Sequence, residues 1–270
     1  MIKIGIVGCG AIGKEICRAV DKGIIKVQLV AIADRKLQAA SAFASSLRSP
    51  PEVMSAEELI DVVDMVVECA SQTAVREILP SALKKGKDVM IMSVGALTSP
   101  ELLKEVTLLA RKYGCRVYLP SGAIVGLDGL KSASIGKIDS VTLTTRKPLS
   151  SLERAPYIEQ CKVDLSTIKE STLIFEGSAE EAVKGFPDNV NVAATLSLAG
   201  IGTQNTKIRI IADPTLERNV HEICVKGNFG KFETRVENVP STANPKTSYL
   251  AALSAIATLR RLSDPIQIGT

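Results

Sequence analysis

Three glycines near the start of the chain have the spacing of a phosphate-binding loop. Gly8, Gly10 and Gly13 form the pattern G-x-G-x-x-G, and an acid, Asp34, follows 21 residues after Gly13. In this pattern the first glycine permits a tight turn, the second lets the backbone approach a pyrophosphate, and the third allows a helix to pack closely on a strand. A carboxylate at Asp34 could accept from both ribose hydroxyls of NAD. These residues predict a dinucleotide site.

The surroundings of the loop strengthen this prediction, because three glycines alone form a weak pattern. An apolar run over residues 3–7 precedes the loop, and a helical pattern follows it. Ala11 and Ile12 lie where the helix would begin and present free N–H groups to an anion. Asp34 favours NAD, since its charge repels a 2′-phosphate, whereas Arg35 beside it could neutralise one. We expect NAD to bind, with NADP as the alternative.

Short apolar runs alternate with helical patterns in the first half of the chain, which indicates βαβ units and a parallel sheet. The expected strands cover residues 3–7, 28–33, 65–70, 88–92 and 115–119. Ligands of such sheets bind outside the carboxyl ends of the strands. Small polar loops follow three of these strands, and they add Ala70, Ser71, Gln72, Gly95 and Ala123 to the candidate cofactor residues. Each loop alone could be an ordinary turn, but three in register favour a binding site.

The pattern changes after about residue 125 to alternating apolar and polar residues, which indicates half-buried antiparallel strands. The expected strands cover residues 141–146, 172–175, 207–211, 220–226 and 231–236. The last three are close in sequence and predict a meander. A capping box predicts a helix start at Ser178, and Asn244 is expected to cap a C-terminal helix.

Two domains follow from these patterns. An α/β domain with a doubly wound parallel sheet is expected over residues 1–122, and a mixed α+β domain is expected over residues 123–240. The segment 241–270, which contains the C-terminal helix, is expected to pack back on the first domain.

The composition excludes several classes of protein. The chain has 270 residues, of which 46% are hydrophobic and 23% charged, so we expect a globular protein rather than a disordered one. A net charge of +4 and 3% aromatic residues argue against nucleic-acid binding. No signal peptide and no apolar run of about 18 residues is apparent, which predicts a cytoplasmic protein without a membrane span. Six scattered cysteines are expected to be free thiols.

The single histidine, His221, is a candidate for proton transfer. On a strand over residues 220–226 it shares a face with Ile223 and Val225, while Cys224 lies on the other face. This argues against a Cys–His dyad and against a local metal site. A lone histidine is more often structural than catalytic. A nicotinamide enzyme, however, needs a group that titrates near neutrality, and His221 is the only unperturbed candidate. A buried lysine is the alternative.

Other polar residues are weaker candidates. Asn189 and Asn191 flank an expected helix start, where a capping role is as good an interpretation as a functional one. Arg146, Lys147 and Lys246 could bind an anion, although ordinary solvated charge is the simpler interpretation of each.

Eight motifs are distributed along the chain, and those in the second half of this set are far more specific than the glycine loop, which is the first of them. They cover residues 8–13, 68–72, 121–128, 144–147, 175–179, 186–194, 219–223 and 244–253. Together they resemble the L-aspartate dehydrogenase family over essentially the whole chain. The resemblance implies a Rossmann domain, an open-faced sheet domain and a homodimer. It also implies oxidation of L-aspartate by NAD or NADP to iminoaspartate, which water hydrolyses to oxaloacetate and ammonia, with a role in NAD biosynthesis.

The resemblance also implies particular roles. The family's catalytic histidine falls on His221, and its contacts on the nicotinamide side fall on Ala123 and on either Asn189 or Asn191, of which we favour Asn191. Three alternatives stay open at this point. They are another Rossmann dehydrogenase or reductase of the homoserine or dihydrodipicolinate type, a regulator that binds NAD without catalysis, and a purely structural dimerisation module.

Overall fold

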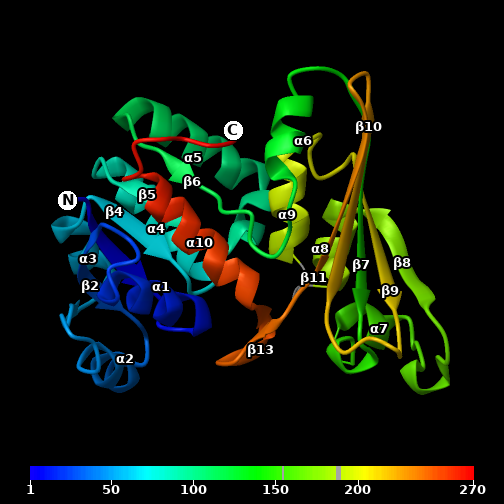
Figure 1. The fold of residues 1–270 in the computed structure, drawn as a ribbon, viewed down its shortest axis with the longest axis horizontal. Coiled ribbons are helices and arrows are strands. Elements are labelled where there is room, and N and C mark those ends of the chain that lie inside the picture. The colour runs from blue at the N-terminus through cyan, green and yellow to red at the C-terminus, as the bar shows by residue number, and fades with distance from the viewer. Residues whose placement is uncertain (154, 187–189) are drawn as a thin grey trace. The chain divides into compact units, whose positions relative to one another are not determined.

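The structure is a computed structural model that describes residues 1–153, 155–186 and 190–270 (Figure 1). The chain divides into two compact units. The N-terminal unit comprises Met1–Pro120 and Ala251–Gln267, and the second unit comprises Ser121–Leu250 and Ile268–Thr270. Each unit has a hydrophobic core of its own.

The N-terminal unit contains a six-stranded parallel sheet with the order β3-β2-β1-β4-β5-β6. The strands are β1 (Lys3–Val7), β2 (Gln28–Ala33), β3 (Glu52–Val53), β4 (Met65–Glu68), β5 (Asp88–Ile91) and β6 (Val117–Tyr118). β1 pairs with both β2 and β4. The strand order therefore reverses at β1, which is where doubly wound sheets bind their ligands. The predicted doubly wound sheet is confirmed.

Helices follow the strands of this sheet along the chain. They are α1 (Ala11–Asp21), α2 (Leu37–Ala44), α3 (Ala56–Val62), α4 (Gln72–Lys84), the short 3-10 helix η1 (Val94–Thr98) and α5 (Pro100–Tyr113). Apart from Glu68 and Asp88, the residues of β4 and β5 are apolar and buried on both faces, as in parallel sheets that are covered on both sides. The C-terminal helix α10 (Tyr249–Arg261) contributes Ala255 and Leu259 to the core around Ile4 and Ile32.

The second unit contains a five-stranded mixed sheet with the order β11-β10-β7-β9-β8. The strands are β7 (Ile138–Lys147), β8 (Thr172–Ser178), β9 (Thr206–Ala212), β10 (Val220–Gly227) and β11 (Gly230–Glu237). β7 is parallel to β9 and antiparallel to β10. The predicted meander over residues 207–236 is therefore wrong. The long strand β7 lies between β9 and β10, because its buried apolar residues complete the core from the centre of the sheet.

One face of this sheet packs on helices, and the other carries charged side chains. The helices are α6 (Leu127–Ala133), α7 (Pro156–Gln160), α8 (Ala179–Gly185) and α9 (Val190–Ala199), with short 3-10 helices η2 (Leu149–Ser151) and η3 (Leu165–Thr167). Apolar side chains of β7, β9 and β10 form the core with α8 and α9. The opposite face carries half-exposed ion pairs such as Arg146–Glu222 and Arg209–Glu176.

Capping was predicted correctly at one helix and wrongly at another. Ser178 and Glu181 form a reciprocal capping box at the start of α8, as predicted. Asn244 does not cap the C-terminal helix, since it begins strand β13 (Asn244–Ser248), which pairs with β12 (Pro240–Ser241).

Among the described residues, no helix combines the length and the hydropathy that a membrane span requires.

Candidate active site

The glycine loop of the N-terminal unit has the geometry of a phosphate-binding turn. Gly8 has a φ of +102°, and a Cβ atom on it would lie 2.7 Å from the backbone of Cys69. A Cβ atom on Gly13 would lie 2.0 Å from the carbonyl oxygen of Gly8. A Cβ atom on Gly10 would meet only the Cys69 carbonyl oxygen, at 4.0 Å. Gly8 and Gly13 therefore permit the fold of the loop, whereas the space in front of Gly10 is open.

A pocket of about 630 Å³ lies over this loop, within the N-terminal unit. Its lining includes the predicted residues Gly8, Gly10, Asp34, Arg35, Ala70 and Ser71. Ala11 and Ile12 begin α1, which has no acidic residue in its first turn and no side-chain cap at Gly10. Because the first N–H groups of a helix have no partner within it, this end of α1 favours an anion. The residues fit a dinucleotide, with its pyrophosphate at the loop.

Asp34 is held in place by the backbone around the pocket. Its Oδ2 atom accepts from the N–H of Cys9 at 2.7 Å, and its Oδ1 atom accepts from the N–H of Lys36 at 2.8 Å. An ionised carboxylate has about four acceptor positions. Both oxygens of Asp34 therefore retain acceptor capacity for ribose hydroxyls. The contact with Cys9 also ties this carboxylate directly to the glycine loop.

A buried acid that was not predicted as a site residue, Glu68, lies at the end of β4. Its Oε1 atom accepts from the N–H of Ala70 at 2.7 Å and from the hydroxyl of Ser93 at 2.8 Å. Its Oε2 atom accepts from the N–H of Ser93 at 3.0 Å. Burial raises the pKa of Glu68, and these hydrogen bonds oppose the shift. Glu68 therefore joins the loops that follow β4 and β5. The available signal was an acid that ends an otherwise apolar strand.

The remaining predicted residues of this unit lie near the same strand ends. Gln72 is the first residue of α4, and Gly95 is buried within η1. Neither lines the pocket over the glycine loop.

His221 lies in the second unit, on the buried face of β10. It is 4% exposed, and its neighbour across the sheet is Thr145 of β7. The Thr145 hydroxyl oxygen and Nδ1 of His221 are 3.0 Å apart. As predicted, Ile223 and Val225 are buried with His221, and Cys224 lies on the other face and is partly exposed. Nothing in the sequence identified Thr145 as a partner, because the pairing depends on the register of distant strands.

The expectation that His221 is unperturbed is wrong. Burial lowers its pKa to about 4, and the charge of Lys147 contributes to the shift. The imidazole is therefore neutral at pH 7. When the Nδ1–H group donates to Thr145, Nε2 has a free lone pair and can accept a proton. The side chain can thus act as a base without first losing a proton.

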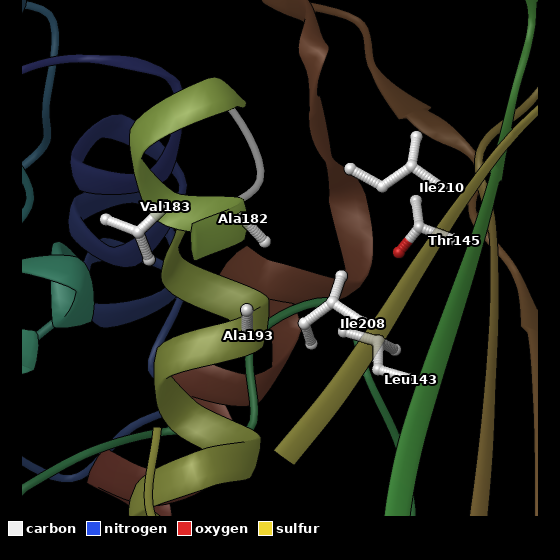
Figure 2. Close-up of a pocket in the computed structure, with 7 residues that line it drawn as sticks. All are labelled: Leu143, Thr145, Ala182, Val183, Ala193, Ile208 and Ile210. Atoms are coloured by element: carbon white, nitrogen blue, oxygen red, sulfur yellow. The ribbon is translucent and has the colours of Figure 1, made fainter. Parts of the chain in front are cut away.

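The residues around Thr145 leave only a very small cavity. Figure 2 shows Leu143, Thr145, Ile208 and Ile210 projecting from the sheet toward the helices that carry Ala182 and Ala193. The cavity has a volume of about 10 Å³, roughly the minimum for one water molecule. It is a gap in the core of this unit and cannot hold a substrate.

The candidates for the nicotinamide side lie in the second unit, in so far as the structure describes them. Ala123 is buried, and its carbonyl oxygen accepts from the side-chain amide of Asn238 at 3.1 Å. Asn191 lies in the first turn of α9 with an exposed side chain. Asn189 lies outside the described residues. Among the residues that are described, no group of three or more His, Cys, Asp or Glu side chains could hold a metal ion.

Together with the fold and the pocket, matches to two family models identify a dehydrogenase that uses a pyridine nucleotide. Residues 8–120 match the model of the NAD-binding domain of homoserine dehydrogenase, and residues 128–262 match the model of the C-terminal domain of aspartate dehydrogenase. The chain belongs to the L-aspartate dehydrogenase family, which confirms the resemblance seen in its motifs.

Relatives with this name match the chain from end to end. The L-aspartate dehydrogenase of Methanosarcina barkeri is 58% identical over 100% of both chains. That of Methanothermobacter thermautotrophicus is 47% identical over 100% of this chain and 99% of its own length. A bacterial relative from Bradyrhizobium diazoefficiens is 43% identical over 100% of this chain and 94% of its own.

Solved structures agree with the family assignment. The aspartate dehydrogenase of Thermotoga maritima is 30% identical, and the match covers 100% of both chains with a TM-score of 0.77. A homoserine dehydrogenase from Thiobacillus denitrificans is 15% identical, with a TM-score of 0.62 over 97% of this chain and 74% of its own. The second likeness concerns the fold alone.

Proposed function

We propose that the protein oxidises L-aspartate with NAD to iminoaspartate, which water converts to oxaloacetate and ammonia. The observation that carries the proposal is that one chain of this family holds both a dinucleotide pocket and a buried, neutral histidine. The names of the full-length relatives supply the substrate.

The N-terminal unit binds the cofactor in this proposal. The backbone of Gly8, Gly10 and Gly13 and the N–H groups of Ala11 and Ile12 bind the pyrophosphate. Asp34 accepts from the adenosine ribose, and Arg35 lies beside it. Further contacts come from residues at the ends of β4 and β5, namely Ala70, Ser71, Gln72 and Gly95. When bound, the nicotinamide supplies the hydride acceptor.

In this proposal, residues of the second unit carry out proton transfer. Nε2 of His221 accepts a proton from the substrate amine, or from the water that attacks the imine. Thr145 fixes the orientation of the ring and accepts from Nδ1–H, so that the charged imidazolium formed by proton transfer keeps one hydrogen bond. Ala123 and Asn191 position the nicotinamide side, with Asn189 as the alternative to Asn191.

We propose NAD as the preferred cofactor because the carboxylate of Asp34 repels a 2′-phosphate, with Arg35 leaving NADP as a weaker alternative. Asp34→Asn removes this repulsion and should improve binding of NADP relative to NAD.

We further propose that the protein is a cytoplasmic homodimer and that its imine product enters NAD biosynthesis.

Absorbance at 340 nm tests the activity directly. Purified protein is mixed with L-aspartate and either NAD or NADP, and L-homoserine replaces L-aspartate in a parallel reaction. We expect aspartate-dependent formation of NADH and none with homoserine. Formation of NADH with homoserine but not with aspartate would favour the alternative of a homoserine-type dehydrogenase. Cofactor binding without reduction by any substrate would favour the regulator.

A further inference from the structure

Lys147 is a buried cation on the same face of the second unit's sheet as His221. It is the last residue of β7 and is 5% exposed. Side chains two residues apart in a strand share a face, and Val141, Leu143 and Thr145 of this series are buried. Lys147 continues that series. It pairs with Ala212 of β9, which is also buried. The face is therefore apolar over most of its length and carries a positive charge at one end.

The strand register brings this charge close to His221. Thr145 lies opposite His221 across the β7–β10 pair, and Lys147 is two residues beyond Thr145. Diagonal neighbours of this kind have Cα atoms about 7–8 Å apart, which a long side chain spans. The positive charge of Lys147 lowers the pKa of His221, which agrees with this proximity. A cation and a neutral proton acceptor are thus adjacent on one buried face.

The neighbouring cation, Arg146, has a different environment. It lies on the opposite face of β7, where its Nε atom is 3.0 Å from Glu222 and its Nη1 atom donates to Ser171 at 3.1 Å. Its guanidinium is half-exposed and forms part of the ion-paired surface. Of the two adjacent basic residues, only Lys147 shares a face with the histidine.

We propose that Lys147 binds a carboxylate of an amino-dicarboxylate substrate and so places the substrate amine at His221. The inference rests on the proposed function, which supplies the substrate class. An ammonium group is a compact charge with three donors on a flexible stem and suits a carboxylate, particularly where water is scarce. A neutral imidazole beside it accepts the proton of the amine. The pair therefore matches the two functional groups of an α-amino acid.

Steady-state kinetics on matched variants tests the proposal. Lys147→Gln removes the charge, Lys147→Met also retains the apolar stem, and Lys147→Arg restores a cation. Arg146→Gln is the control, since it removes a positive charge from the adjacent residue on the other face. For Lys147→Gln and Lys147→Met we expect the KM for L-aspartate to rise about 30-fold or more, as for the loss of a charged hydrogen bond. The dissociation constant of NADH should change less than about threefold, and Lys147→Arg should recover part of the loss.

Succinate provides a second readout that does not require turnover. As a dicarboxylate without an amine, it should raise the melting temperature of the NADH-bound wild type and of Arg146→Gln, but not that of Lys147→Gln. An unchanged KM in both neutral Lys147 variants, or an equal rise in Arg146→Gln, would overturn the inference. If the wild type does not oxidise aspartate, the proposed function fails, and the succinate shift still decides whether Lys147 binds a carboxylate.

Discussion

The two units position their candidate functional residues in different ways. In the N-terminal unit the pocket is shaped mainly by backbone. A Cβ atom on Gly8 or Gly13 would clash with neighbouring backbone atoms, and the Asp34 carboxylate accepts from two backbone N–H groups. In the second unit the proposed reactive group is a side chain, His221, which contacts a hydroxyl 76 positions away in sequence. The proposed cofactor site therefore depends on local backbone geometry, whereas the proposed proton acceptor depends on pairing between distant strands.

The largest expected effect separates these two functions. His221→Ala removes the proton acceptor, so we expect kcat to fall by about 10²–10⁴. The dissociation constant of NADH should stay within about threefold of the wild-type value, because the pocket lies in the other unit. Steady-state kinetics and fluorescence titration of NADH give the two numbers. Turnover at the wild-type rate would remove His221 from the mechanism.

The buried histidine also predicts a dependence of stability on pH. Its pKa is about 4 in the folded protein and 6.5 as an ordinary histidine. Between these values the unfolded chain binds a proton that the folded protein excludes, so the free energy of unfolding falls as the pH drops from about 7 to 4. At pH 4 this loss in the free energy of unfolding amounts to about 3 kcal/mol.

Denaturant unfolding of wild type and His221→Gln over this range measures that contribution. Glutamine does not titrate, so the stability of wild type relative to the variant should decline steadily below pH 6.5. Parallel curves for the two proteins would show that His221 titrates normally in the fold.

Gly10→Ala tests the pocket without disturbing the fold. A Cβ atom at this position meets nothing closer than 4.0 Å in the protein but extends into the space where a pyrophosphate is proposed to lie. We expect the dissociation constant of NADH to rise about 10- to 100-fold, as for an overpacked site, with little change in melting temperature. Gly129→Ala, whose Cβ would make ordinary contacts with Phe232 at 3.7 Å, is the control. Unchanged NADH binding in Gly10→Ala would place the cofactor elsewhere.

The smallest expected effect concerns the partner of the histidine. Thr145→Val keeps the shape of the side chain and removes its hydroxyl. A single hydrogen bond contributes about 0.5–1.5 kcal/mol, so we expect kcat to fall about 3- to 10-fold with NADH binding unchanged. Thr145→Ser retains the hydroxyl and should recover most of the rate. Equal losses in the valine and serine variants would point to packing rather than to orientation of the ring.

The same contrast explains what the sequence could predict. Strands β1 and β2 were predicted residue for residue, because their apolar runs end at the glycine loop and at Asp34. The two-residue strand β3 has no pattern long enough to detect, and it was missed. In the second unit the strands were found, but the meander was wrong, since alternation within a strand gives its faces and not its partners.

The individual site residues show the same difference between what a local pattern predicts and what depends on distant strands. The face of His221 was predicted from alternation along β10. Its contact with Thr145 and its lowered pKa were not, because both depend on the register with β7 and on burial. Glu68 was overlooked for the same reason, since its partner Ser93 follows a neighbouring strand. Backbone turns are encoded by a few adjacent residues, whereas buried polar contacts are encoded by the whole fold.

Titration of His221 by NMR tests the central claim most directly. The chain contains one histidine, so its imidazole signals need no assignment by mutation. We expect the ring to stay neutral from pH 8 to about pH 5, with the proton on Nδ1, and to titrate near pH 4 if the fold persists. A midpoint near 6.5 would contradict the account, because it would show an exposed imidazole instead of a buried base held by Thr145.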